Sequence, residues 1–235
     1  MDAMTDLWVF GVDGIGEVRP GDDLAGMIVT ALEGRGERLE PNDVVVVTHK
    51  VVSKQEGRVV EILDEEAYRR LVLSEATRIV RRRGDLVIAQ TRHGFICANA
   101  AVDRSNVAGG MAVLLPVDPD RSAHRLRMIL ERASGARIGV IITDTFGRPW
   151  RRGLVDVAIG VSGVRVIDDL RGTRDTHGNE LHVTEVAVVD EVAAAADLAM
   201  GKASNIPVAI VRGLDIGGDG RATDLVRPAE EDLFR

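Results

Sequence analysis

Residues 140–153 read VIITDTFGRPWRRG, and this stretch organises the interpretation of the rest of the chain. An apolar run leads directly into Asp144 and Thr145, which predicts a buried strand that ends in a carboxylate and a hydroxyl group. The Gly-Arg-Pro that follows predicts a turn. Three arginines lie within eight residues of the aspartate: Arg148, Arg151 and Arg152. The stretch therefore places acidic, hydroxyl and basic groups at the exit of one strand.

Composition limits the class of protein. The chain has 235 residues, 45% of them hydrophobic, which is enough for one domain with its own core or for two small intergrown subdomains. A net charge of −7 argues against a nucleic-acid or anionic-membrane partner. A single cysteine, Cys97, excludes an internal disulfide framework and fits a cytoplasmic protein. The longest mostly apolar stretch, residues 186–200, is interrupted by three acids and is no membrane span.

Hydrophobic periodicity predicts an α+β fold with mixed or antiparallel sheets and packed helices. The chain lacks the regular strand–helix alternation of a doubly wound sheet. We expect a single domain over residues 1–235, with 215–235 as a tail and the glycine-rich residues 213–222 as a flexible loop. Helices are predicted over 22–34, 65–83, 118–135 and 184–201, and strands over 7–12, 43–50, 137–145, 156–167 and 206–214, with two more inside 85–102.

Common nucleotide and metal motifs are missing from the sequence. Residues 199–204 (AMGKAS) contain the Gly-Lys pair of a phosphate-binding P-loop, but Ala196 stands at the first glycine position and Ala203 replaces the required hydroxyl residue. Neither a dinucleotide fingerprint nor a zinc-protease motif is present. A bound nucleotide would therefore need an uncommon fold.

Candidate cation ligands lie in two separated segments. Asp103 and Asn106 follow a predicted strand pair, where they either form an ordinary polar turn or bind a hard cation. Asp144 and Thr145 favour the second reading, because carboxylate and hydroxyl oxygens suit Mg²⁺ or Mn²⁺. Since Asp103 and Asp144 are 41 residues apart, only the fold can bring them together.

Basic residues suggest phosphate contacts. His49, Lys50 and Lys54 follow a predicted strand, either as a solvated basic turn or as phosphate ligands. The arginines after Asp144 allow the same two interpretations. Residues 13–24 form a glycine-bearing loop before a helix, whose backbone N–H groups could hold a polar ligand. Together these groups suggest acids that hold a metal ion and bases that neutralise a phosphate.

The order of these segments resembles a known family. VVSKQEGR, AAVDRSNV, VIITDTFGRPWRRG and HGNELHVTEVAVVDEVAAAADLAMGK resemble the coenzyme F420:L-glutamate ligases, and the resemblance runs from about Val9 to Leu214. It implies a GTP-dependent ligase that adds L-glutamate to F420-0 and produces GDP and phosphate. It also implies a family-specific α+β fold, an intertwined homodimer, Mn²⁺ or Mg²⁺, expected as two ions, and a stimulating K⁺.

The resemblance also assigns expected roles to residues. It places metal ligands at Asp103, Asp144 and Thr145 and GTP contacts at Lys54 and Asn106. Further GTP-binding stretches fall on Gly14, Ile15, Gly16 and Glu17 and on the pair His49 and Lys50, where relatives often carry small hydroxyl residues. Arg148, Arg151 and Arg152 are candidates for substrate anions, and no general base is evident. A metal-dependent phosphohydrolase and a non-catalytic nucleotide-binding module remain the alternatives.

Overall fold

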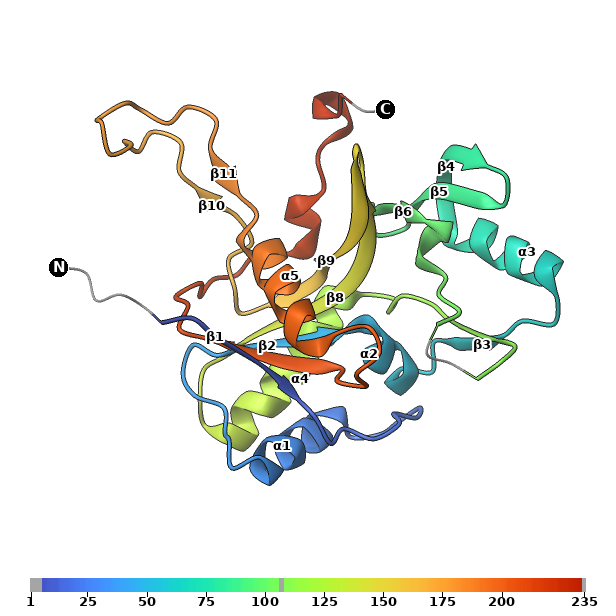
Figure 1. Cartoon of the computed structure of the whole chain (residues 1–235), viewed down its shortest axis with the longest axis horizontal. Coiled ribbons are helices and arrows are strands. Elements are labelled where there is room, and N and C mark those ends of the chain that lie inside the picture. The colour runs from blue at the N-terminus through green and yellow to red at the C-terminus, as the bar shows by residue number, and fades with distance from the viewer. Residues whose placement is uncertain (1–5, 106–107, 234–235) are drawn as a thin grey trace.

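A five-stranded sheet forms the centre of the molecule (Figure 1). The computed structural model describes residues 6–105 and 108–233. The strands lie in the order β1 (Trp8–Val12), β12 (Val208–Arg212), β2 (Val44–Thr48), β8 (Gly139–Arg148) and β9 (Arg151–Ser162). Strands β2 and β8 are parallel, whereas the other neighbours are antiparallel. The expected α+β architecture with mixed sheets is confirmed.

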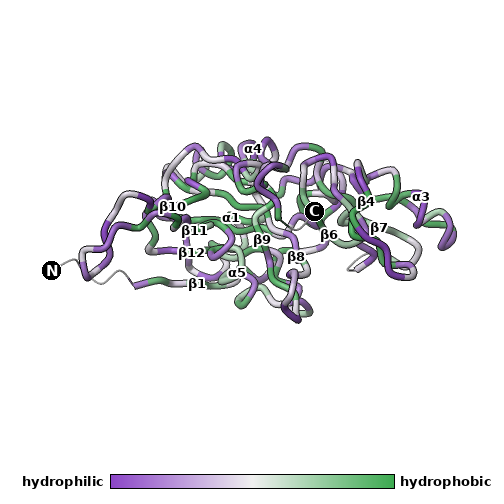
Figure 2. Tube along the Cα trace, turned by 90° about the horizontal axis from the view of Figure 1, so that it is seen from above, coloured by the Kyte–Doolittle hydropathy of each residue, from purple (hydrophilic) through white to green (hydrophobic). Residues whose placement is uncertain are grey.

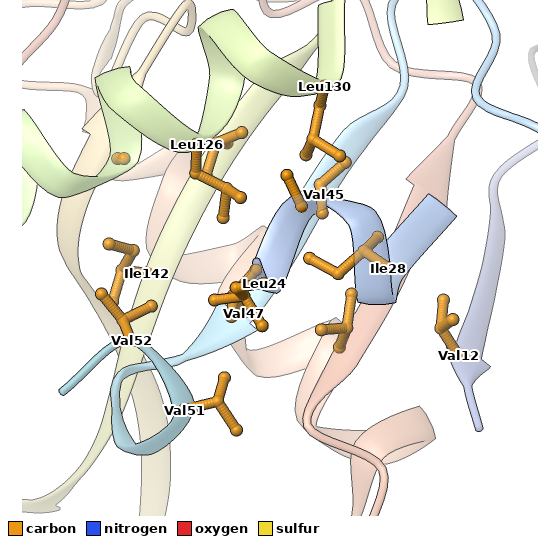
Figure 3. Close-up of a cluster of buried hydrophobic side chains, with 14 of the residues drawn as sticks. Val12, Leu24, Ile28, Val45, Val47, Val51, Val52, Leu126, Leu130 and Ile142 are labelled. Atoms are coloured by element: carbon orange, nitrogen blue, oxygen red, sulfur yellow. The ribbon is translucent and has the colours of Figure 1, made fainter. Parts of the chain in front are cut away.

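Helices cover both faces of this sheet. Helices α1 (Leu24–Gly34) and α4 (Pro119–Ser134) pack on one face, where Val45 and Val47 join the apolar cluster shown in Figure 3. Helix α5 (Val188–Met200) covers the other face, against Val44 and Val46. Burial on both sides explains why the central strands carry a β-branched residue at nearly every position instead of alternating with polar ones.

A smaller unit extends from one end of the central sheet (Figure 1). It has its own apolar cluster, which includes Val72, Ala89 and Leu114. Its elements are β3 (Val59–Glu61), α3 (Glu65–Glu75), β4 (Ala76–Arg83), β5 (Leu86–Thr91), β6 (Ile96–Ala98), a 3₁₀ turn (Asn99–Ala101) and β7 (Met111–Val113).

A second projection carries the short strands β10 (Asp168–Asp169) and β11 (Glu185–Val186), and its trace is largely hydrophilic in Figure 2. Two further 3₁₀ turns, Ala222–Leu225 and Ala229–Glu231, lie near the C-terminus. Within the described part of the chain, no helix is long and apolar enough to cross a membrane.

The predicted helix over 65–83 is wrong in its second half. Helix α3 ends at Glu75, and Ala76 has extended backbone angles (φ −90°, ψ 132°). Residues 76–83 instead form β4, which pairs with β5 through a turn at Gly84. The β-branched Thr77, Ile79 and Val80 suit a strand, and pairing with β5 outweighs the helical spacing of the apolar residues.

The predicted strand over 43–50 is also too long. Strand β2 ends at Thr48, and the expected basic turn is the helix α2 (His49–Gln55). Its buried Val51 and Val52 anchor it on the core. Because Lys50 and Lys54 are four residues apart, the helix places both lysines on one face.

The glycine-rich residues 213–222 are a further correction, since they pack closely against the molecule. Ile216 is buried, and the Gly220 N–H group donates to the Val164 carbonyl at 2.9 Å. A Cβ atom at Gly218 would lie 2.7 Å from the backbone nitrogen of Arg165, so these glycines permit close contact and the segment is no free loop.

Asp120 tests how the C-terminal segment is held. Its Oδ1 accepts hydrogen bonds from the backbone N–H groups of Val161 (2.8 Å) and Ala222 (3.1 Å), and burial raises its pKa. Asp120→Ala leaves two donors without a partner and should lower the free energy of unfolding by about 2–4 kcal/mol. Asp120→Asn keeps an acceptor oxygen and should lower it by less than half as much. Urea unfolding at pH 7 measures both losses, and equal losses would contradict this role.

The same carboxyl predicts a pH dependence. Because its pKa is raised in the folded protein, its contribution to stability is complete below the unfolded-state pKa and is lost as pH rises through the folded-state pKa. Asp120→Asn should therefore flatten the fall in stability between about pH 4 and the raised pKa. Urea unfolding across this range, with wild type as the reference, measures the difference.

Candidate active site

The parallel pairing of β2 and β8 creates the candidate site. Thr48 lies opposite Thr143, so both strands release their next residues at the same edge of the sheet. His49 Nε2 lies 3.4 Å from Asp144 Oδ1, and His49 Nδ1 lies 3.4 Å from the Ser53 hydroxyl oxygen. His49 is fully buried, and its Nε2 atom has no hydrogen-bond partner among the described residues, so its relation to Asp144 is one of proximity.

The lysines of this chain are confined to one place. Among 30 basic residues, only three are lysines, and all three line one pocket of about 780 Å³: Lys50, Lys54 and Lys202. Each ammonium group is paired with a carboxylate. The Nζ–oxygen distances are 2.9 Å from Lys50 to Asp103, 2.6 Å from Lys54 to Glu17 and 3.4 Å from Lys202 to Asp156. The pocket therefore presents three compact cations, each within reach of an acid.

Two loops complete the pocket wall. The loop between β1 and α1 contributes Ile15, Gly16 and Glu17, and residues 201–207 between α5 and β12 contribute Lys202, Asn205 and Pro207. The structure thus brings most of the predicted nucleotide-binding stretches together with Lys50 and Lys54. Gly14 lines a different, open hollow beside α1. Asn106 lies outside the described residues.

Asp103 is held as a charged acceptor. Burial raises its pKa, but a hydrogen bond from Lys50 and another from the Ser105 N–H group (2.7 Å) outweigh burial, and its pKa is lowered. Lys50 also donates to the Ser105 hydroxyl at 2.6 Å. Since Lys50 directly follows His49 in α2, adjacent residues of one short helix contact Asp103 and Asp144.

Asp144 and Thr145 carry oxygen atoms of the kind that Mg²⁺ and Mn²⁺ bind. Asp144 Oδ1 accepts from the Thr145 N–H group at 2.7 Å, and the Thr145 hydroxyl donates to Asp156 Oδ1 at 2.5 Å. Within residues 6–105 and 108–233, no group of three or more histidine, cysteine, aspartate or glutamate side chains could hold a metal ion. Few protein ligands and mostly oxygen atoms suit Mg²⁺ or Mn²⁺, which keep water and phosphate in their coordination shell.

The three candidate arginines lie away from this pocket. Arg148, Arg151 and Arg152 occupy the exposed tip of the β8–β9 hairpin, where Arg148 donates to the Arg152 carbonyl at 2.6 Å. Four residues of strand separate Arg148 from Asp144, which corresponds to about 13 Å. The structure does not bring them to the lysines, and their contact with substrate anions stays a prediction.

Asp156 and Lys202 were missed by the sequence reasoning. Asp156 is a lone carboxylate inside the apolar run of β9, which is a signal for a buried acid with a dedicated partner. Lys202 belongs to the Gly-Lys pair that fails as a P-loop, and the structure supports that rejection. The pair follows the C-terminal end of α5, whereas a P-loop lysine lies at a helix N-terminus.

Fold and pocket together define an α+β protein with a charged pocket in which three lysines are paired with acids. The model of the F420-0:gamma-glutamyl ligase family matches residues 14–213, and the chain belongs to this family. Membership makes it an enzyme of the ligase class.

Several similar proteins are named coenzyme F420:L-glutamate ligase. The protein of Methanothermobacter thermautotrophicus is 42% identical, and the match covers 97% of this chain and 98% of the relative. The proteins of Methanopyrus kandleri (44%, covering 93% and 94%) and Archaeoglobus fulgidus (40%, covering 97% and 96%) are equally extensive matches. The resemblance inferred from the motifs is confirmed.

The reactivity of the buried Cys97 thiol tests whether the core next to Asp144 is accessible to solvent and reagents. Burial raises the pKa of its thiol to about 12, and the Asp144 charge adds to the effect. At pH 8 the reactive thiolate would be about one molecule in ten thousand. We expect reaction with a disulfide reagent such as DTNB to be roughly a thousandfold slower in the folded protein than in guanidinium. A comparable rate in both conditions would show that the core behind Asp144 opens readily.

Proposed function

We propose that this chain joins L-glutamate to coenzyme F420-0 in a GTP-dependent reaction, as a step of coenzyme F420 biosynthesis. The observation that supports it most is the gathering of all three lysines in one pocket. Family membership supports the ligase chemistry, and the names of the relatives support the substrates. An intertwined homodimer and stimulation by K⁺ belong to the same proposal; light scattering and a KCl titration would test them.

Lysine suits a pocket in which charges change partners. An ammonium group is a compact point charge, whereas a guanidinium group locks onto a carboxylate with two parallel hydrogen bonds. Arg212 holds the buried Asp43 in this second way, at 2.8 Å and 2.9 Å. A lysine can exchange its carboxylate for a phosphate oxygen by rotation about the bonds of its flexible side chain, so Lys50, Lys54 and Lys202 are proposed as contacts of the GTP phosphates.

Asp103, Asp144 and Thr145 would supply ligands to Mn²⁺ or Mg²⁺ beside these lysines, expected as two ions because Asp144 and Thr145 face opposite sides of β8. When bound, the metal would neutralise phosphate charge and polarise the bond to the leaving group. The carboxylate of F420-0 would attack the γ-phosphorus, which releases GDP and gives an acyl phosphate. The amine of glutamate would then attack the acyl carbon, with formation of the amide and release of phosphate and a proton. The work of the protein is to orient the reactants and neutralise charge.

The reaction itself is tested with F420-0, L-glutamate, GTP and Mn²⁺, with mass spectrometry of the product and an assay of phosphate. We expect glutamylated product and phosphate in equal amounts, dependent on all four components. Phosphate release at the same rate without glutamate would identify a phosphohydrolase instead. Binding of GTP without turnover would identify a nucleotide-binding module, and equal activity with ATP would refute the preference for GTP.

Lys54 tests the phosphate contact. Lys54→Ala should weaken GTP binding by roughly 1.5–3 kcal/mol, the scale of a hydrogen bond to a charged group. Folding should change little, because its partner Glu17 is 70% exposed and will be solvated. Arg69→Ala is a control, since it removes the same charge beside Asp85 and lies in the smaller unit, outside the lysine pocket. Calorimetry measures the GTP affinity of both variants. Equal losses would show that Lys54 acts only through its positive charge and makes no direct phosphate contact.

A further inference from the structure

Asp156 has an unusual set of partners for a buried carboxylate. Only 3% of the residue is exposed, and both oxygens accept hydrogen bonds. Oδ2 accepts from the Thr143 hydroxyl at 3.0 Å, and Oδ1 accepts from the Thr145 hydroxyl at 2.5 Å. The Lys202 ammonium lies 3.4 Å from Oδ1. One carboxylate therefore connects two threonines of β8 with a lysine of the pocket wall.

These contacts determine the direction of the Thr145 hydroxyl group. A hydroxyl has one hydrogen, and the bond to Asp156 uses it. The remaining lone pairs of Thr145 Oγ1 must point elsewhere, and they already accept a hydrogen bond from the Lys202 ammonium. Because Lys202 lines the pocket, the accepting side of Thr145 faces a positive charge at the pocket wall.

We propose that Asp156 is a positioning residue that turns the lone pairs of Thr145 toward a divalent cation and holds Lys202 beside it. The inference rests on the proposed function, which assigns Thr145 to the metal. It assigns to Asp156 an indirect role, since groups that orient a metal ligand tune affinity without touching the ion. A carboxylate serves this role because it accepts from both threonines at once, whereas an amide can accept on one side only.

Asp156→Asn tests the inference with little change in shape. One threonine hydroxyl must then lose or reverse its hydrogen bond, and Lys202 loses its ionic partner. We expect the affinity for Mn²⁺ alone to fall about 10- to 100-fold, as measured by the electron paramagnetic resonance signal of free Mn²⁺. The melting temperature without metal should fall modestly, because the variant loses one hydrogen bond but also removes a buried charge.

Two control variants distinguish a positioning role of Asp156 from a purely electrostatic or structural one. Asp197→Asn removes a carboxylate from the same pocket wall that has no hydrogen bond to Thr145, and it should change Mn²⁺ affinity by no more than about fivefold. Thr143→Val removes the other threonine partner and should lower stability while leaving Mn²⁺ affinity nearly unchanged. If Thr143→Val weakens Mn²⁺ binding as strongly as Asp156→Asn does, Asp156 is a structural residue and the inference is wrong.

A double-mutant cycle with Thr145→Val gives a second measure, which also serves if Asp156→Asn alone is unstable. If Asp156 acts through Thr145, the double variant should bind Mn²⁺ no more weakly than the poorer single variant. Independent, multiplicative losses would overturn the proposal. Thr145→Ser, which retains the hydroxyl, should recover most of the affinity lost in Thr145→Val.

Methylation of the lysines tests whether Asp156 holds Lys202 in place. After reductive ¹³C-methylation, which keeps the positive charge, three lysines and the α-amino group give signals. The Lys202 signal should shift in Asp156→Asn and the Lys54 signal should not; an unchanged Lys202 signal would contradict the pairing of Lys202 with Asp156.

The outcomes separate this inference from the proposed function. Wild type that binds Mn²⁺ with the expected coupling but forms no amide would refute the proposed function alone. Amide formation with independent losses in the cycle would refute this inference alone, and wild type that binds no Mn²⁺ would refute both.

Discussion

The parallel pairing of β2 with β8 is the interaction on which the site depends. Its register places Thr48 beside Thr143, so the next residues of both strands emerge at one edge of the sheet. The short helix α2 can then direct its first two residues at separate acids, His49 at Asp144 and Lys50 at Asp103. A shift of one residue in this pairing would turn the side chains of β2 to the opposite face and separate these groups. Burial of the strands on both faces makes such a shift costly.

The pairing of β8 with β9 positions Asp144, Thr145 and Asp156. Alternate residues of a strand face opposite sides, so Asp144 faces His49 while Thr145 faces Asp156 on the paired strand. The antiparallel register sets Thr145 directly opposite Asp156, which explains their short hydrogen bond without any contribution from a loop. Rigid strands on both sides hold these polar groups more firmly than a surface turn would.

The division of labour between lysine and arginine follows from their shapes. Arginines form the forked contacts that hold the fold, as Arg212 does with Asp43 and Arg58 does between the Leu115 carbonyl and Glu75. All three lysines line the pocket, where an ammonium group can move between a carboxylate and a ligand. Such a pocket is nearly balanced in charge before it binds anything, which limits repulsion among the three cations.

The sequence by itself determined the apolar strands 44–47 and 140–142, the helices α1 and α4, and the family, because these signals are local patterns or ordered motifs. It also marked Asp103, Asp144 and Lys54 as candidate functional residues. Only the tertiary structure decided that residues 76–83 pair as a strand, that 49–55 form a helix, and that Asp156 and Lys202 meet across 46 residues. Those outcomes depend on contacts between distant segments, where pairing and burial outweigh the weak preferences of each short stretch.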